Sequence, residues 1–208
     1  SGFTSIDRVT GGFRKGYLTI IAGRPGMGKT AIGLQFALNA ASLGYPVAVF
    51  SQEMGEEDIA TRYLSNVSGY SNIEIATGRC EIEKLLATSE QLLKLGLYID
   101  DTPAITLLEL KAKTRKMILK FGIKMIIVDY LGLMSPAGHK QNREQEVSQL
   151  SAGLKNIARD LDIPVIALHQ LNRNSESKAD KKPQLYNLRD SGAIEQDADV
   201  VMLLHRPE

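Results

Sequence analysis

The sequence predicts an α/β fold, a doubly wound and mostly parallel sheet with helices on both of its faces. Short apolar runs alternate along the chain with amphipathic helical patterns, which indicates strand and helix in turn. Most of these runs are apolar throughout, as expected for strands that helices cover on both sides. A length of 208 residues is sufficient for one such domain with a sizeable core.

The strands of this sheet are predicted at six short apolar runs. In chain order they are residues 17–23, 46–51, 97–100, 124–129, 164–169 and 199–205. Doubly wound sheets bind their ligands at the carboxyl ends of the strands. The residues at the end of each run are therefore the first candidates for function.

Two helices are predicted from the glycines that follow them. The stretch 29–43 runs into Gly44, and the stretch 56–67 stops before Gly69. Glycine commonly ends a helix because it adopts the left-handed conformation without strain. We therefore expect Gly44 to be a C-cap.

Two more helices are predicted from their first residues or from their apolar pattern. Thr106 and Glu109 have the spacing of a capping box, which predicts a helix that reaches about Phe121. In the stretch 143–162, apolar residues recur in steps of three and four, so they form one helical stripe that we expect to pack in the core. The stripe consists of Val147, Leu150, Leu154, Ile157 and Leu161.

Composition excludes several classes of protein. The 25 Lys and Arg residues nearly balance the 24 Asp and Glu residues, so the net charge of +1 gives no global signal for a polyanion partner. Cys80 is the only cysteine, which excludes a disulfide framework, a cysteine-rich zinc site and an iron–sulfur cluster, and fits a reducing cytosol. The chain has no apolar run of membrane-spanning length and no signal-peptide pattern. We therefore expect a cytoplasmic protein without a membrane partner.

Residues 23–30, GRPGMGKT, match the phosphate-binding pattern G-x-x-x-x-G-K-[ST]. Such a loop needs glycine because it wraps backbone N–H groups around phosphate oxygens, and a Cβ would obstruct that approach. A chance glycine-rich turn is the alternative, but this loop lies between a predicted strand and a predicted helix, where a P-loop belongs. We expect Lys29 to reach the β- and γ-phosphates, Thr30 to offer a hydroxyl to Mg²⁺, and the helix N-terminus to favour the anion. The predicted contacts are Gly23, Pro25, Gly26, Met27, Gly28, Lys29, Thr30 and Ala31.

Two carboxylates at other strand tips extend this site. Asp129 ends an apolar run, where a carboxylate can hold Mg²⁺ through water as the usual partner of a P-loop threonine. Glu53, at the tip of the run 46–51, can orient or deprotonate a water in line with the γ-phosphate. The alternative for Glu53 is that it belongs to an acidic helix start. Asp100 and Asp101 are more simply explained as a turn before the next helix.

Together with the rest of the chain, these motifs resemble the RecA-like motor domain of DnaB-type replicative DNA helicases. The likeness covers nearly the whole sequence. It comes from TSIDRVTGGFRKGYLTIIAGRPGMGKT, SQEM, IIVDYLGLM, REQEVSQLSAGLKNIARDLDIPVIALHQLNR and LRDSGAIEQDADVVMLLHR, of which the last two are more diagnostic than the P-loop. The sequence departs from the family at Gln52, usually aliphatic, at Gly132, usually Gln, and at His169, usually Ser.

The resemblance implies roles that spacing alone does not. Gln170 matches a strand-end glutamine that senses the γ-phosphate, and a neutral amide suits a sensor because it leaves no buried charge behind when the phosphate departs. Arg62 matches a position that contacts the nucleotide base, with an ordinary surface arginine as the alternative. Arg189, Asp190 and Gly192 match the family's contacts to the phosphates of single-stranded DNA.

The family works as a ring, so the resemblance also implies partners. It implies ATP hydrolysis with Mg²⁺, coupled to movement on single-stranded DNA and unwinding of duplex, in a homo-hexamer that engages a primase and a helicase loader. In such a ring a neighbouring subunit supplies a basic finger to each ATP. The expected setting is the cytoplasm of a bacterial cell or of a phage-infected host.

We expect residues 1–208 to be a RecA-like ATPase domain cut from a longer protein. The amino-terminal domain, the linker helix and the last strands, which carry the finger, are expected to be missing from it. The fragment should then bind ATP and Mg²⁺, hydrolyse ATP slowly and be mainly monomeric. The alternatives are a RecA-, RadA- or KaiC-like ATPase in which ATP switches DNA binding or assembly without unwinding, or a helicase-derived module that has lost the motor role.

Overall fold

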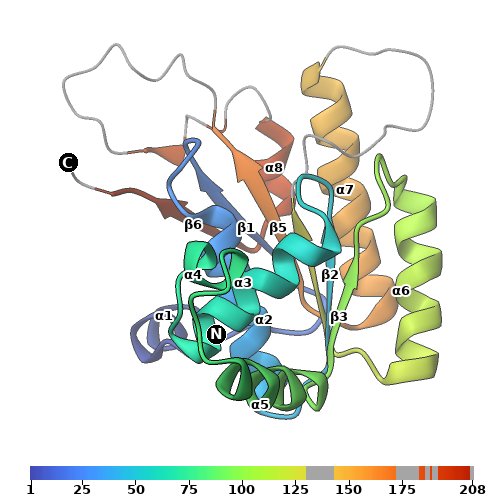
Figure 1. Ribbon diagram of the computed structural model, residues 1–208. Helices are drawn as coiled ribbons and strands as arrows, with labels where there is room; N and C mark the ends of the chain where they lie inside the picture. Colours follow the sequence, from blue (N-terminus) through green and yellow to red (C-terminus); the bar gives the residue numbers. More distant parts are fainter. Residues whose placement is uncertain (130–142, 172–182, 186–187, 189–191, 207–208) are drawn as a thin grey trace.

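A six-stranded parallel sheet forms the centre of the molecule. The computed structural model describes residues 1–129, 143–171, 183–185, 188 and 192–206 (Figure 1). Within the described residues all strand pairings are parallel, and the strand order is β3-β2-β4-β5-β1-β6. Every strand boundary lies within one residue of the prediction. The strands are β1 Leu18–Gly23, β2 Val47–Ser51, β3 Leu97–Asp100, β4 Met125–Asp129, β5 Val165–Gln170 and β6 Val200–Leu204.

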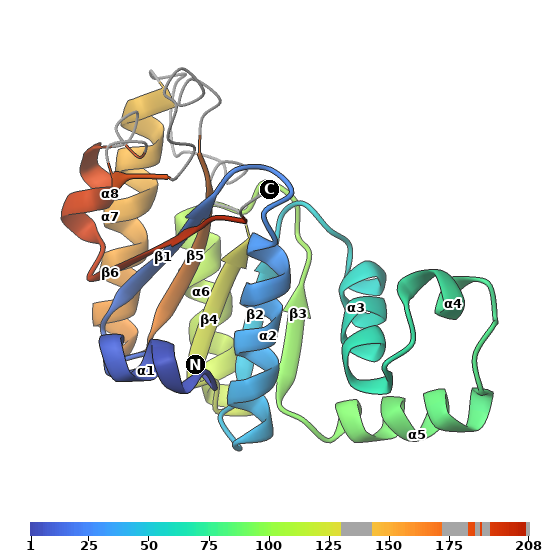
Figure 2. The ribbon, with the colours of Figure 1, turned by 90° about the vertical axis from the view of Figure 1, so that its left-hand side faces the viewer.

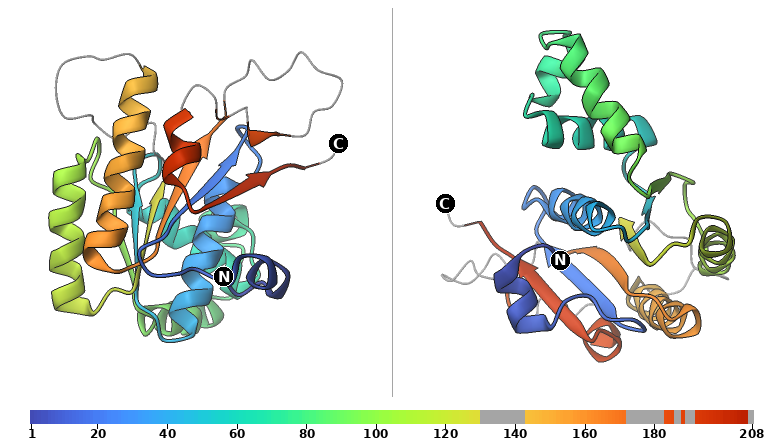
Figure 3. Two further views of the ribbon diagram at one scale, coloured as in Figure 1. Left: turned by 180° about the vertical axis from the view of Figure 1, so that it is seen from behind. Right: turned by 90° about the horizontal axis from the view of Figure 1, so that it is seen from below.

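Helices cover both faces of this sheet, as predicted (Figure 3). Successive strand residues face opposite sides, so Ile20 and Ile21 of β1 belong to two different apolar clusters. The first cluster joins the sheet to α6, α7 and α8, and the second joins it to α2 and α3. The bounds of these helices are α2 Lys29–Ser42, α3 Glu56–Ser68, α6 Leu107–Phe121, α7 Arg143–Leu161 and α8 Gly192–Asp197.

The structure confirms most of the predicted helix signals. Gly69 is the C-cap of α3 with a φ of 80°. The prediction for Gly44 was wrong by one residue, because Leu43 is the C-cap of α2 and Gly44 follows it with a left-handed φ of 82°. The capping box of α6 is complete, with both of its backbone N–H groups bonded to a side chain of the pair. The α7 stripe packs in the first cluster, where Leu154 is fully buried.

Four helices of the described chain were not predicted, and three of them have seven residues or fewer. They are α1 Thr4–Thr10, α4 Asn72–Ala76, α5 Ile82–Leu93 and α8. The region from α3 to α5 projects away from the sheet, so most of α5 lies outside the core (Figure 2). A sequence signal for α4 did exist, since Ser71 and Glu74 form a capping box. Among the described residues, no helix is long and apolar enough to cross a membrane.

Candidate active site

The strand tips predicted to contribute to chemistry meet at one edge of the sheet. The neighbours β2, β4, β5 and β1 all run in the same direction. In their register, Ser51 lies opposite Asp129 and Gly23 opposite Gln170. Beyond the strand end, the Gln52 N–H donates to the Asp129 carbonyl. The P-loop, Gln170, Asp129 and the turn after β2 therefore share one edge.

The loop 24–28 leads from β1 into α2 and leaves an open cradle. Gly26 and Gly28 have left-handed backbones with φ of 75° and 88°, and a Cβ on either would meet nothing described within 4 Å. Gly28 is the N-cap of α2, and within the described chain no side chain caps this helix start. The first N–H groups of α2 are therefore available to an anion.

Lys29 is the first residue of α2 and folds back across the loop. Its Nζ donates to the carbonyl of Arg24 at 3.2 Å. Burial lowers the pKa of Lys29, while the negative charges of Asp129 and Glu53 oppose that change. Because both carboxylates act on one ammonium group, the three charges belong to the same site.

Asp129 is a buried carboxylate, only 3% exposed. The Thr30 side chain hydrogen-bonds to it, yet its Oδ2 has no hydrogen-bond partner among the described residues. Burial raises the pKa of Asp129 and outweighs the Thr30 bond, and the charge of Glu53 raises it further, against Lys29 and Arg62. A buried carboxylate oxygen beside a threonine hydroxyl offers the oxygen ligands that Mg²⁺ prefers.

Glu53 lies in the turn that joins β2 to α3, and its side chain is exposed. Buried Ser51 closes this turn, since its Oγ donates to the Met54 carbonyl at 2.7 Å and accepts from the Met54 N–H at 3.1 Å. Arg62 is also exposed, on α3. The charges of Glu53 and Arg62 both act on Asp129, so the structure brings both residues to the edge that holds the P-loop.

Two residues around the Glu53 turn were missed by sequence reasoning. The side chain of Gln52 bonds to the backbone of Thr102 and Ile105, and the side chain of Asp101 bonds to the backbone of Glu56. The sequence explains Asp101 only as part of a turn. No local pattern could reveal these contacts, because each joins segments 45 to 53 residues apart.

The predicted DNA contacts are only partly within the described chain. Arg189 and Asp190 lie outside the described residues, as does the segment 130–142. Gly192 begins α8, whose Ile194 is fully buried in the first apolar cluster. The DNA-binding assignment therefore stays a prediction.

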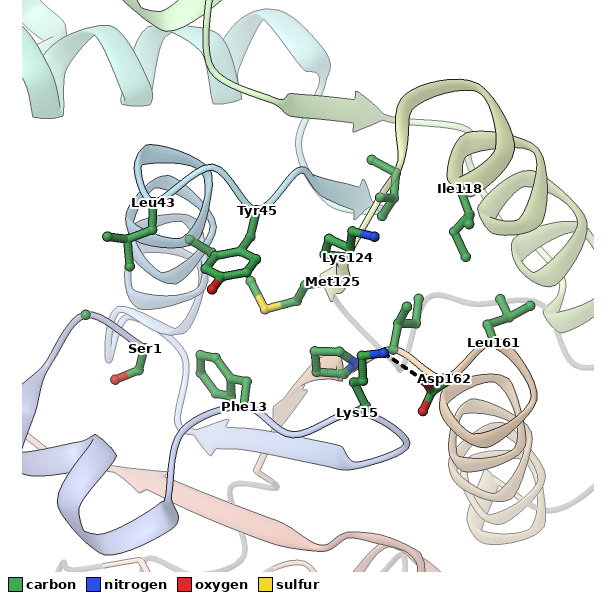
Figure 4. Close-up of a pocket in the computed structure, with 15 residues that line it drawn as sticks. Ser1, Phe13, Lys15, Leu43, Tyr45, Ile118, Lys124, Met125, Leu161 and Asp162 are labelled. Carbon is green, nitrogen blue, oxygen red and sulfur yellow. Dashed lines mark hydrogen bonds and ion pairs between the residues drawn. The ribbon is translucent and has the colours of Figure 1, made fainter.

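A cavity of about 490 Å³ lies at the opposite edge of the sheet (Figure 4). Its walls include Lys15, Tyr45, Lys124 and Pro164, each just before the start of a strand. Lys15 forms an exposed ion pair with Asp162 at 2.9 Å across its rim. No residue of the P-loop lines this cavity, so it is not the phosphate site.

Proteins of similar sequence match the whole length of this chain. The sequence is 45% identical over 213 residues to the replicative DNA helicase DnaC of Bacillus subtilis (strain 168), covering all of this chain and 47% of that protein. It is 43% identical to the replicative DNA helicase DnaB of Geobacillus stearothermophilus, with the same coverage. The chain spans about half the length of the curated relatives it matches.

Two solved structures share this fold. A DnaB-like replicative helicase, solved in a study of its interactions with primase, has a TM-score of 0.94 and 36% identity, covering 99% of this chain and 51% of the other. A second solved structure, of an ATPase domain, has a TM-score of 0.94 and 35% identity, covering 99% of this chain and 75% of the other. These neighbours confirm the RecA-like fold, and the helicase names do not favour the alternative of a RecA-, RadA- or KaiC-like ATPase. The family described as DnaB-like helicase C-terminal domain matches residues 1–208. The chain belongs to this family of helicase C-terminal domains.

Proposed function

We propose that this domain is the ATP-hydrolysing motor of a replicative DNA helicase. The observation that supports this best is the meeting of Lys29, Thr30, Glu53 and Asp129 at the open start of α2, each linked to another by a bond or a charge. A phosphate cradle alone would suit any nucleotide binder. The two carboxylates beside it add what hydrolysis needs, namely a metal ligand and a base.

ATP is the proposed substrate, with its phosphates in the 24–28 loop. The free N–H groups at the start of α2 would bind phosphate oxygens, and Lys29 would exchange its bond to the Arg24 carbonyl for the β- and γ-phosphates. Thr30 would hold Mg²⁺ directly, and Asp129 would hold it through water. The ion, when bound, neutralises charge that develops on the phosphates.

Three further roles complete the proposed mechanism. Glu53 would orient and deprotonate the attacking water, for which an exposed carboxylate at the mouth of the site is suitable. Gln170, opposite Gly23 in the sheet, would hydrogen-bond the γ-phosphate or the water and so report hydrolysis to the segment after β5. Arg62 would stack on the base.

The proposed contacts with DNA and with other subunits are made by the longer protein from which we expect this domain to come. Arg189 and the backbone near Gly192 would contact the phosphates of single-stranded DNA, downstream of the Gln170 tip. The Asp190 carboxylate would repel phosphate, so Asp190 would act through its backbone or by orienting Arg189. A homo-hexamer would supply the basic finger from a neighbouring subunit, and a primase and a helicase loader would bind the ring. Exposed apolar side chains on α5 support contact with another subunit, since Ile82 is 72% exposed and Leu93 is 82% exposed.

The test is the rate of ATP hydrolysis by the full-length protein with and without single-stranded DNA. We expect strong stimulation by DNA, together with unwinding of a forked duplex. Lys29→Ala should abolish hydrolysis, and Glu53→Gln should lower it by roughly 10² to 10⁴-fold without loss of nucleotide binding. A full-length protein that forms filaments and pairs strands without unwinding would contradict the proposal.

A further inference from the structure

The position of the Glu53 carboxylate depends on the turn that holds it. An exposed side chain is not fixed by burial, so its backbone decides where it can reach. Ser51 fixes the inner side of this turn through its two bonds to Met54. The outer side faces residues 101–105, which connect β3 to α6.

Gln52 joins the start of the turn to this connection. Its Nε2 donates to the Thr102 carbonyl at 2.8 Å and to the Ser51 carbonyl at 3.2 Å. Its Oε1 accepts from the Ile105 N–H at 3.0 Å. Because Gln52 directly precedes Glu53, these bonds fix the backbone from which the Glu53 side chain extends.

Asp101 holds the end of the same turn. Its Oδ2 accepts from the N–H of Glu56, the first residue of α3, at 3.0 Å. The N-cap of α3 is Gly55, which has no side chain with which to cap the helix, so a residue 45 positions away does so. A Cβ on Gly55 would lie 3.9 Å from the same Oδ2, so Asp101 packs against the turn.

The connection itself is anchored to α6 and can act as a fixed support. Lys113 Nζ donates to both oxygens of Asp100, at 2.9 and 2.6 Å, and to Thr102 Oγ1 at 2.5 Å. Ala104 has a left-handed φ of 50°, a conformation that a residue with a Cβ keeps only where its surroundings enforce it. The turn therefore takes its position from the connection.

We propose that Asp101 is a positioning residue for ATP hydrolysis. It fixes the end of the turn that places the Glu53 carboxylate, and Gln52 fixes the start of the same turn. This inference rests on the proposed role of Glu53 as the base. Without the Asp101 bond the Glu53 turn shifts, and a displaced catalytic group costs about tenfold to a hundredfold in rate. The P-loop follows a different strand, β1, and Arg62 lies six residues beyond the capped Glu56 in α3, so nucleotide affinity is retained.

Two matched pairs of variants break or keep the bond between Asp101 and Glu56. Asp101→Ala removes the acceptor, whereas Asp101→Asn loses the charge but keeps an oxygen. Glu56→Pro removes the donor N–H at the first helical position, where proline is favoured, and Gly55 already has the extended ψ of 161° that suits a residue before proline. Glu56→Ala removes only the side chain. In the full-length protein with single-stranded DNA, kcat is measured beside the Kd of a fluorescent ATP analogue.

We expect Asp101→Ala and Glu56→Pro to lower kcat about tenfold or more, with Kd changed by less than about twofold and the matched variants close to wild type. In a Glu53→Gln background, Asp101→Ala should slow hydrolysis no further. If both bond-breaking variants hydrolyse like their matched partners while Glu53→Gln is slow, the inference is wrong. If Glu53→Gln hydrolyses at the wild-type rate, the proposed role of Glu53 is wrong instead. Should Asp101→Ala fail to fold, the Glu56 pair decides.

Discussion

A comparison of Gly28→Ala with Gly44→Ala should separate the effect of backbone strain on stability from the loss of phosphate binding. Gly28 and Gly44 lie at the two ends of α2 with left-handed φ of 88° and 82°. A Cβ at either position meets nothing described within 4 Å, so the cost to the fold is backbone strain alone, about 1–2 kcal/mol. For a domain of this size that corresponds to a Tm lower by roughly 2–8 °C for each variant.

The two variants should differ in their affinity for nucleotide. At Gly28 the added methyl group enters the cradle and should weaken ATP binding by at least about tenfold, or ~1.4 kcal/mol, whereas Gly44→Ala should bind normally. Thermal unfolding without ligand and titration with a fluorescent ATP analogue measure the two effects. Equal affinities in the two variants would refute the placement of phosphate at the start of α2.

Two further predictions concern stability. Burial raises the pKa of Asp129 above its ordinary value, so the folded state favours the neutral carboxyl group. This contribution to stability is fully present below the pKa that Asp129 has in the unfolded chain, and it is lost as the pH rises through the higher pKa of the folded state. Asp129→Asn should therefore raise the Tm of the nucleotide-free domain at neutral pH, by a margin that shrinks on acidification, while weakening Mg²⁺-dependent binding; a lower Tm at neutral pH would contradict it. Leu154→Ala, at a fully buried site of α7, should lower the free energy of unfolding in urea by about 2–5 kcal/mol. Leu119→Ala, at a side chain that is 84% exposed, should leave it almost unchanged. Similar losses in the two variants would show that the α7 stripe is not part of the core.

Most of the fold follows from local pattern. Strands covered on both faces must be apolar throughout, and this made all six visible in the sequence. The ends of α2, α3 and α6 were visible because left-handed glycine and the capping box act within a few residues. Helix α5 was not predicted, although its apolar residues recur at helical spacing; in the structure Ile82 and Leu86 of this helix are exposed.

The sequence by itself determined the P-loop and the strand tips that bear Glu53, Asp129 and Gln170, because glycine conformation, helix start and strand end are local properties. Only the tertiary structure decided which tips are neighbours, since the strand order is not the chain order. It also decided the burial that raises the pKa of Asp129 and the cap that Asp101 provides for α3. These depend on contacts between segments far apart in the chain, and local periodicity contains no information about them.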